Sequence, residues 1–313
     1  MIVVAGEALI DLVPSTATPP EADARLTPLV PRRGGGPYNT ALALGRLGSP
    51  TAFCSRVSTD GYGGALLDAL HAAGVDTAPV QRGPEPTTLA VAEVNEEGSA
   101  GYVFYVEGTA DRLFELPAAL PPGTTALSLG TCSLVLEPGA TAYEALLRRE
   151  AQRGVFTALD PNIRADLIAD PDAYRARFAS WLPHLNLLKL SVEDATWLAG
   201  SPDVTAAARG WLAAGPAAVV VTHGADGLGV HTRDAAELRV PGVRIDVVDT
   251  IGAGDTVNAA LLHRLAAHDA LSGAAVANLT PDTWRDILTF AARASALTCS
   301  RAGAEPPFAA ELA

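Results

Sequence analysis

The chain has 313 residues, and 22 lysines and arginines against 35 aspartates and glutamates give it a formal net charge of −13. This acidic balance excludes a basic face for nucleic acid or for an acidic membrane surface, so we expect neither as a partner. The single lysine, Lys189, lies outside any G-x-x-x-x-G-K-[ST] frame, which excludes a P-loop enzyme and leaves backbone amides and arginine for any phosphate chemistry.

The start of the chain and its cysteines indicate a cytoplasmic protein. Met1 leads directly into IVVAGEALIDLV, which has no basic region and carries Glu7 and Asp11, so we do not expect a secretory signal. No apolar run approaches the ~18 residues that span a bilayer. The cysteines are odd in number and contain no C-x-x-C pair, so we expect them to be reduced.

Short apolar runs alternate with helical patterns along most of the chain. The runs typical of strands buried on both faces are Ile2–Ala5, Ala126–Leu129, Val155–Leu159, Leu185–Leu190 and Ala217–Val221. The helical patterns are Tyr38–Leu47, Gly61–Ala73, Ala140–Arg153, Asp172–Trp181 and Val204–Ala213. This alternation predicts an α/β fold in which helices cover both faces of a mostly parallel sheet.

Two segments break the alternation. Leu9–Pro31 and Thr87–Glu107 alternate apolar and polar residues, and the second predicts a hairpin around Asn95–Gly101. Together they predict a small antiparallel sheet in the position of a lid over a site. We expect one domain over residues 1–313, with lid segments around 9–31 and 87–107 inserted in it. An exposed lid sheet also favours a homodimer.

A glycine-bracketed segment, DTIGAGD at Asp249–Asp255, precedes the helical pattern TVNAALLHRLAAH. Free amides in the first helical turn, from Ala253 to Asp255, form an anion site. The helix start also keeps Asp255 ionised as a proton acceptor. A base beside an anion site fits phosphoryl transfer to a hydroxyl. The alternative is a helix cap after a tight turn, but glycines on both sides favour the catalytic interpretation.

A second glycine-rich segment, RRGGGPYN at Arg32–Asn39, precedes the pattern TALALGRLG. Three glycines allow the backbone to contact a polyhydroxylated ligand, and Asn39 offers both donors and an acceptor. By itself this segment is equally consistent with a flexible loop.

Together, G-G-x-x-x-N near the start and D-T-x-G-A-G-D near the end resemble the ribokinase-like (PfkB-type) carbohydrate kinases over essentially the whole chain. Further landmarks follow in order: GEALIDL, SRVSTDGYG, DPNIR, KLSVED, VTHGADG and TCSRAGAEPP. GEALIDL, DPNIR and TCSRAGA look most like the fructokinase branch. The resemblance implies a three-layer α/β/α fold with a small antiparallel β lid, and ATP-dependent transfer of the γ-phosphoryl group to a sugar hydroxyl.

The resemblance also implies catalytic roles. Asp255 would deprotonate the acceptor hydroxyl, and Arg164 of DPNIR would meet the transferred phosphate, the alternative for Arg164 being a surface ion pair. Lys189 is expected only as a strand-end neighbour of the nucleotide site. The positions that would stabilise charge on the γ-phosphoryl group are Gly252, Ala253 and Gly254.

For the sugar, Asp11 would accept hydrogen bonds from hydroxyls, the alternative being a turn residue that enters the lid. Tyr102 and Phe104 either close over the sugar or form the core of the small sheet, and the sequence does not choose between these interpretations. Along the opposite edge of the sugar the resemblance implies Gly34, Gly35 and Asn39.

The positions implied for the nucleotide phosphates and ribose are Thr222, Gly224 and Gly227. The family often carries N-x-x-E for magnesium, whereas this chain has Ser191 and Asp194 there. Asp194 is the best match for Mg²⁺, through water. Asp249, with backbone carbonyls near Ile251 and Gly303, is a candidate site for a monovalent cation such as K⁺.

Fructose, phosphorylated at its terminal carbon, is the substrate that the resemblance favours, with 2-keto-3-deoxygluconate and ribose as alternatives. From another class, a non-catalytic sugar-binding sensor would not need the base at Asp255. A dinucleotide dehydrogenase is excluded, because AGEALID stands where G-x-G-x-x-G would follow the first strand.

Overall fold

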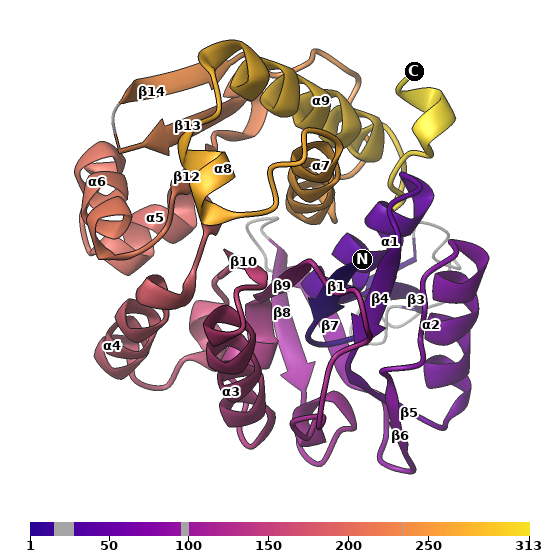
Figure 1. Ribbon diagram of the computed structural model, residues 1–313. Coiled ribbons are helices and arrows are strands. Elements are labelled where there is room, and N and C mark those ends of the chain that lie inside the picture. The colour runs from indigo at the N-terminus through magenta and orange to yellow at the C-terminus, as the bar shows by residue number, and fades with distance from the viewer. Residues whose placement is uncertain (16–27, 95–99, 234) are drawn as a thin grey trace.

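The computed structural model describes residues 1–15, 28–94, 100–233 and 235–313. Within these residues an eight-stranded sheet has the order β14-β13-β12-β11-β10-β9-β1-β4 (Figure 1). In this order, every pair of neighbours from β12 to β4 is parallel. β13 is antiparallel to both of its neighbours, β12 and β14. The strands are β1 (Ile2–Ala5), β4 (Thr51–Cys54), β9 (Ala126–Gly130), β10 (Phe156–Asp160), β11 (Leu187–Ser191), β12 (Ala218–Thr222), β13 (Leu228–Thr232) and β14 (Ala235–Val240).

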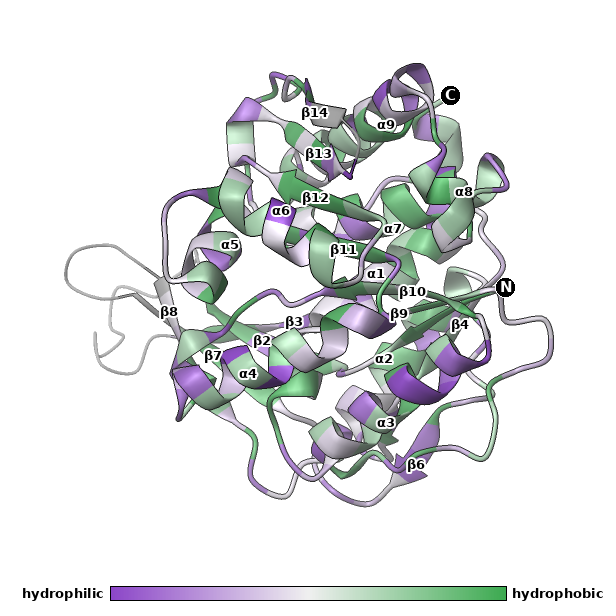
Figure 2. Ribbon diagram, turned by 60° about the vertical axis from the view of Figure 1, so that its left-hand side comes forward, coloured by the Kyte–Doolittle hydropathy of each residue, from purple (hydrophilic) through white to green (hydrophobic). Residues whose placement is uncertain are grey.

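Two hydrophobic cores lie on opposite faces of this sheet, because side chains alternate along each strand. In β1, Ile2 and Val4 join one core, while Val3 and Ala5 join the other. The first core includes α1 (Gly36–Arg46), α2 (Gly61–Ala72), α7 (Ala253–Ala267) and α9 (Pro281–Cys299). The second includes α3 (Gly139–Gln152), α4 (Pro171–Trp181), α5 (Val192–Ala199) and α6 (Val204–Ala214). The predicted three-layer α/β/α fold is confirmed, and Figure 2 shows the apolar character of β11 and β12 between the helices.

A second sheet, of order β3-β2-β7-β8, is called the lid sheet below. Its strands are β2 (Leu9–Pro14), β3 (Leu29–Gly34), β7 (Leu89–Val94) and β8 (Ala100–Tyr105). The pairs β2–β3 and β7–β8 are antiparallel as predicted, and a parallel β2–β7 pair joins them. In Figure 2 β8 lies at the left edge of the molecule. Residues 95–99 of the predicted turn, and 16–27 of the first lid segment, lie outside the described residues.

Smaller elements complete the chain. β5 (Arg56–Ser58) and β6 (Gln81–Gly83) form a parallel pair, and α8 (Gly273–Ala277) precedes α9. Across the described residues, no helix is both long and apolar enough to cross a membrane.

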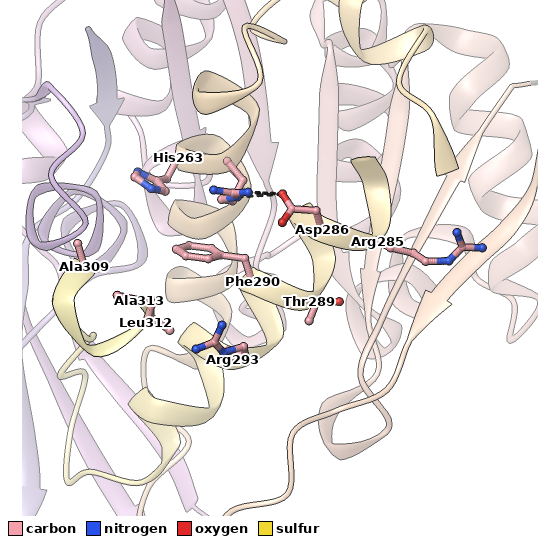
Figure 3. Close-up of a pocket in the computed structure, with 10 residues that line it drawn as sticks. His263, Arg285, Asp286, Thr289, Phe290, Arg293, Ala309, Leu312 and Ala313 are labelled. Atoms are coloured by element: carbon pink, nitrogen blue, oxygen red, sulfur yellow. Dashed lines mark hydrogen bonds and ion pairs between the residues drawn. The ribbon is translucent and has the colours of Figure 1, made fainter. Parts of the chain in front are cut away.

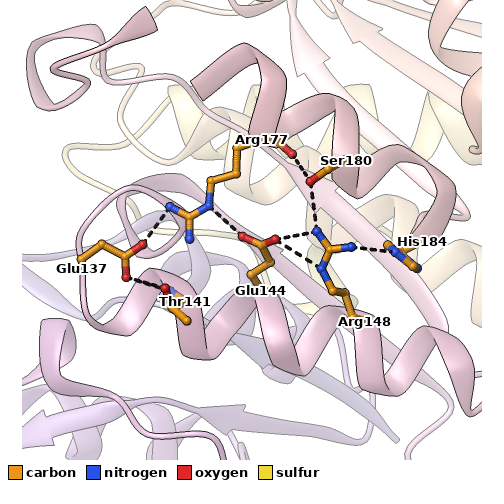
Figure 4. Close-up of polar contacts among 7 residues, drawn as sticks. All are labelled: Glu137, Thr141, Glu144, Arg148, Arg177, Ser180 and His184. Carbon is orange, nitrogen blue, oxygen red and sulfur yellow. Dashed lines mark hydrogen bonds and ion pairs between the residues drawn. The ribbon is translucent and has the colours of Figure 1, made fainter. Parts of the chain in front are cut away.

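A polar network fastens α3 to α4 on the outer layer (Figure 4). Glu144 of α3 accepts from Arg148 Nη2 at 2.6 Å and from Arg177 Nε of α4 at 2.7 Å. Arg177 also pairs with Glu137 at 2.9 Å. The shared carboxylate of Glu144 therefore bridges the two helices, which also meet where Arg148 Nη2 donates to Ser180 Oγ at 3.0 Å.

Replacing Glu144 with Ala is expected to lower the free energy of unfolding by about 1 kcal/mol, because two guanidinium groups lose their common acceptor at a partly screened position. Urea denaturation measures this change. The control is Glu115→Ala, at an exposed loop residue whose side chain has no ion-pair partner among the described residues. Equal midpoints for the two variants would show that the network adds nothing to stability.

Candidate active site

A cavity of about 480 Å³ opens where several strands of the main sheet end. Its walls come from the lid sheet, from the starts of α1 and α7, and from loops that follow β9 and β10. In open α/β sheets, ligands bind at the carboxyl ends of the strands, so this is the expected place for a site. The predicted residues that line it are Asp11, Gly35, Asn39, Tyr102, Phe104, Arg164, Asp249, Gly252, Gly254 and Asp255.

Asp255 lies in the first turn of α7 and is 7% exposed. Its Oδ2 accepts a hydrogen bond from Asn39 Nδ2 at 2.9 Å. Burial raises the pKa of Asp255 to about 6, although the bond from Asn39 opposes this shift. The alternative helix-cap role is not what the structure shows, because the N-cap residue of α7 is Gly252 and no side chain caps this helix. A buried carboxylate that is ionised near neutral pH can accept a proton from a ligand.

The first turn of α7 offers free backbone donors. Gly252 has φ 76°, a left-handed conformation that favours glycine. The sequence predicts free amides from Ala253 to Asp255, but the amide of Ala253 donates to Thr250 O at 3.2 Å. Within the described residues, the amides of Gly254 and Asp255 have no hydrogen-bond acceptor. These two amides therefore form the anion site at the helix start.

The glycine loop before α1 packs directly against these groups. Gly35 has φ 104°, and a Cβ on Gly36 would lie 3.2 Å from Asp255 Oδ1. A Cβ on Gly34 would lie 2.1 Å from Asp11 Oδ2. Side chains at these positions would fill the space beside both carboxylates, so the glycines are a steric requirement of the site. Gly34 itself is buried behind the cavity wall, against Asp11.

Asp11 and Arg164 both line the cavity, and the positive charge of Arg164 interacts with the carboxylate of Asp11. Burial raises the pKa of Asp11 to about 6, and the charge of Arg164 partly opposes the shift. Arg164 Nη1 donates to Asn162 Oδ1 at 2.7 Å. Among the described residues Arg164 has no carboxylate ion-pair partner, so its predicted alternative as a surface ion pair is not observed. Its guanidinium is available to an anionic ligand.

The lid aromatics point into the cavity. Tyr102 and Phe104 line it from β8, with ring centroids 6.1 Å apart, whereas Val103 and Tyr105 lie on the exposed face of the strand. The two rings contact each other and line the cavity, and closure over a sugar stays a prediction.

A second cavity, of about 570 Å³, contains the predicted nucleotide positions Thr222, Gly224 and Gly227. Its lining is largely apolar and includes Val243, Ile245 and Val257. It shares Thr250 and Gly254 with the first cavity. The two cavities therefore meet at the anion site.

Ser191 and Asp194 do not line either cavity. They form the capping box of α5, in which Asp194 Oδ2 accepts from Ser191 N at 3.2 Å. Asp194 Oδ1 accepts from Ile163 N at 2.9 Å. The described residues contain no cluster of three or more His, Cys, Asp or Glu that would bind a metal by itself. The residues present therefore fit magnesium only as an ion whose ligands are mainly phosphate oxygens and water molecules.

Asp249 accepts hydrogen bonds from both loops that the sequence predicts beside a monovalent cation. Its Oδ1 accepts from Ile251 N at 3.0 Å and its Oδ2 from Gly303 N at 2.8 Å. The carboxylate thus holds the segment before α7 against the loop that follows α9.

The sequence interpretation missed two charged residues of the first cavity. Lys189, expected only beside the nucleotide site, lines this cavity, and its Nζ donates to Asp160 Oδ2 at 2.6 Å. Glu7 accepts from Gly36 N at 3.2 Å and from Ser133 N at 3.0 Å, and burial raises its pKa to about 7. The missed signal is charge in an apolar run, inside β11 for Lys189 and directly after β1 for Glu7, because charged side chains are almost never buried unless paired.

A third cavity, of about 550 Å³, lies between α7, α9 and the end of the chain (Figure 3). There His263 stacks on Phe290, and Arg264 pairs with Asp286. This cavity shares no lining residue with the other two. It is therefore not part of the candidate active site.

Two cavities that meet at free helix-start amides beside a buried carboxylate define a phosphotransferase that acts on a hydroxyl. The model of the pfkB family carbohydrate kinases matches residues 1–310. The chain belongs to the pfkB family of carbohydrate kinases, and it is a sugar phosphotransferase.

Similar proteins agree with this assignment. The chain is 40% identical over 289 residues to a fructokinase of Rhizobium leguminosarum bv. trifolii, which covers 91% of this chain and 86% of that protein. The fructokinase of Xylella fastidiosa with bound ATP superimposes with a TM-score of 0.88 at 26% identity, covering 99% and 96% of the two chains. The fructokinase of Vibrio cholerae O395 with fructose, ADP and calcium superimposes with a TM-score of 0.79 at 26% identity, covering 97% and 94%.

Proposed function

We propose that this protein is an ATP-dependent fructokinase that transfers the γ-phosphoryl group to the hydroxyl on the terminal carbon of fructose. The observation that carries the proposal is the meeting of the two cavities at Thr250 and Gly254. One cavity is lined by charged and amide side chains that can hydrogen-bond a sugar, and the other has the largely apolar walls that a nucleotide base needs. The relatives named fructokinase support the choice of sugar.

In this mechanism the residues of the first cavity hold and activate the sugar. Asp11 and Asn39 bind hydroxyls, the backbone at Gly35 allows the sugar to approach closely, and Gly34 leaves room for the carboxylate of Asp11. Tyr102 and Phe104 cover it and exclude water. Asp255 accepts the proton of the attacking hydroxyl, which requires its ionised form and therefore a pH above about 6.

The residues at the junction stabilise the charge of the transferred group. The amides of Gly254 and Asp255 donate to its oxygens, with Gly252 and Ala253 shaping the turn, and Arg164 binds from the opposite side. Thr222, Gly224 and Gly227 hold the nucleotide in the second cavity. Magnesium bound with ATP would neutralise phosphate charge, and Asp194, which lines neither cavity, would reach it only through water. A monovalent cation such as K⁺ fits beside Asp249.

We also propose how the chain is organised and where it works. Residues 1–313 form one catalytic domain, with lid segments around 9–31 and 87–107. The lid sheet pairs with that of a second copy, which is supported by the exposed face that Leu29, Val103 and Tyr105 form, Tyr105 being 60% exposed. Three free cysteines support the reducing cytoplasm as its location.

A panel of acceptors tests the choice of sugar. We expect the largest kcat/KM for fructose, with ribose and 2-keto-3-deoxygluconate at least about tenfold lower, a difference of about 1.4 kcal/mol in transition-state binding. Coupled measurement of ADP formation gives these values. A larger kcat/KM for the sugar acid would indicate that Arg164 binds its carboxylate and would replace fructose as the substrate.

A further inference from the structure

Lys189, the single lysine of the sequence, is buried at the junction of the two cavities. It is 4% exposed, and its Nζ lies 2.6 Å from Asp160 Oδ2. A Cβ built on Gly254 would lie 3.1 Å from Nζ, so the ammonium group faces the backbone of the first turn of α7. A buried ion pair seldom adds net stability over apolar residues of the same volume. Stability therefore does not account for a charged pair in this place.

Two buried carboxylates lie close to this one ammonium group. β10 ends at Asp160, β11 carries Lys189, and α7 carries Asp255 in its first turn. Asp160 Oδ1 has no hydrogen-bond partner among the described residues, so the pairing with Lys189 is the main compensation for its charge. The charge of Asp160 raises the pKa of Asp255, and the charge of Lys189 lowers it.

Other groups face Asp255 from the remaining walls. Asn39 of α1 donates directly to it, and Arg164 lowers its pKa from the loop after β10. The further acids that line the same cavity are Glu7, Asp11 and Asp249. None of these acids has Lys189 as a hydrogen-bond partner in the part of the chain that the structure describes. The net electrostatic effect of neighbouring charges on the carboxyl group of Asp255 therefore depends on the pair formed by Lys189 and Asp160.

We propose that Lys189 is a positioning residue for phosphoryl transfer, held by Asp160 against Gly254 so that its charge cancels that of Asp160 and leaves Asp255 ionised as the base. This inference rests on the proposed function, because it assigns a task within the same site. Asp160 fixes the ammonium group in place, and Lys189 removes the repulsion that a second carboxylate would impose on Asp255.

Direct titration tests the proposal without any substrate. In protein labelled with ¹³C at aspartate carboxyls, the Asp255 resonance is identified by its loss in Asp255→Asn. We expect Lys189→Met, which keeps the length of the side chain, to raise the pKa of Asp255 by about one unit or more. We expect Asp160→Asn to lower it. The double variant should return to within about half a unit of the wild type, because both charges are gone.

The control is Arg285→Met, which removes a positive charge from the exposed pair with Asp282 on α9 and should leave the Asp255 titration unchanged. An Asp255 pKa that is the same in Lys189→Met and wild type would overturn the proposal, as would a double variant that titrates like Lys189→Met alone. If Lys189→Met does not fold, the Asp160→Asn variant provides the test. A lowered pKa of Asp255 in that variant supports the proposal, and an unchanged pKa of Asp255 overturns it.

Kinetics separate this proposal from the proposed function. The acid limb of the kcat/KM profile should move to higher pH in Lys189→Met and to lower pH in Asp160→Asn. A purely structural role would lower the folded fraction without moving the limb. Absence of turnover in the wild type with every sugar would contradict the proposed function, while the carboxyl titration would still test the role of Lys189.

Discussion

Replacing Asp255 with Asn is expected to lower kcat for sugar phosphorylation by about 10²–10⁴-fold, the usual contribution of a positioned general base. Asn has nearly the same shape, so the packing against Asn39 and the start of α7 should survive. The free amides of the anion site are also retained. The expected result is therefore loss of the chemical step with sugar affinity changed much less, measured as kcat and KM in a coupled ADP assay.

The matched control is Asp166→Asn, the same chemical change at an exposed residue outside both cavities, which should retain wild-type activity. The wild-type rate should also fall as the pH drops through about 6, because burial raises the pKa of Asp255 and protonation removes the base. An Asp255→Asn variant that keeps more than about a tenth of the wild-type kcat would show that Asp255 is not the base.

Gly252→Ala is expected to lower kcat by about 10²-fold or more while leaving Asp255 chemically intact. Gly252 has φ 76°, and its Cβ would lie 2.6 Å from the Cβ of Ala304. Relief of this clash must move either the turn that presents the amide of Gly254 or the loop that Asp249 holds through Gly303. Loss of one such donor typically costs 10²–10³-fold in acyl-transfer enzymes, and we expect a similar loss here.

Gly210→Ala in α6 is the control for this substitution. No atom outside the neighbouring backbone of α6 lies within 4 Å of its Cβ position, so the variant should keep full activity and gain up to about 1 kcal/mol in stability from reduced backbone entropy of the unfolded chain. Urea denaturation of both variants separates misfolding from catalytic loss. A fully active Gly252→Ala variant would contradict the role of this turn in the anion site.

The buried strands were predictable because each is a short apolar run. β1 matches its prediction residue for residue, and β10, β11 and β12 differ by one or two residues. The sequence interpretation missed β4, because its four residues TAFC begin with a polar threonine and contain only three consecutive apolar residues. It also missed α9, the longest helix in the described residues, whose pattern lies outside the motifs that carried the resemblance.

The site was predictable where a motif sits at the start of a helix or the end of a strand. Arg164 and Asp255 follow β10 and β14, whose ends share one edge of the main sheet, while the lid strand β2 carries Asp11 and the lid strand β3 leads to Asn39 beside that edge. The pair of Lys189 with Asp160 was not predictable, since these residues are 29 positions apart. Their contact depends on β10 and β11 being neighbours, which is a property of the sheet order and not of either strand's sequence.

The most direct test of the account is the stoichiometry of a reaction of the wild-type protein with ATP, magnesium and fructose, followed by ³¹P NMR. Transfer at a shared junction predicts one phosphate ester of the sugar for each ADP formed, and no ADP above background without the sugar. The result that would contradict the account is ADP accompanied by free inorganic phosphate at the same rate with or without sugar, since the hydroxyl would then not be the acceptor.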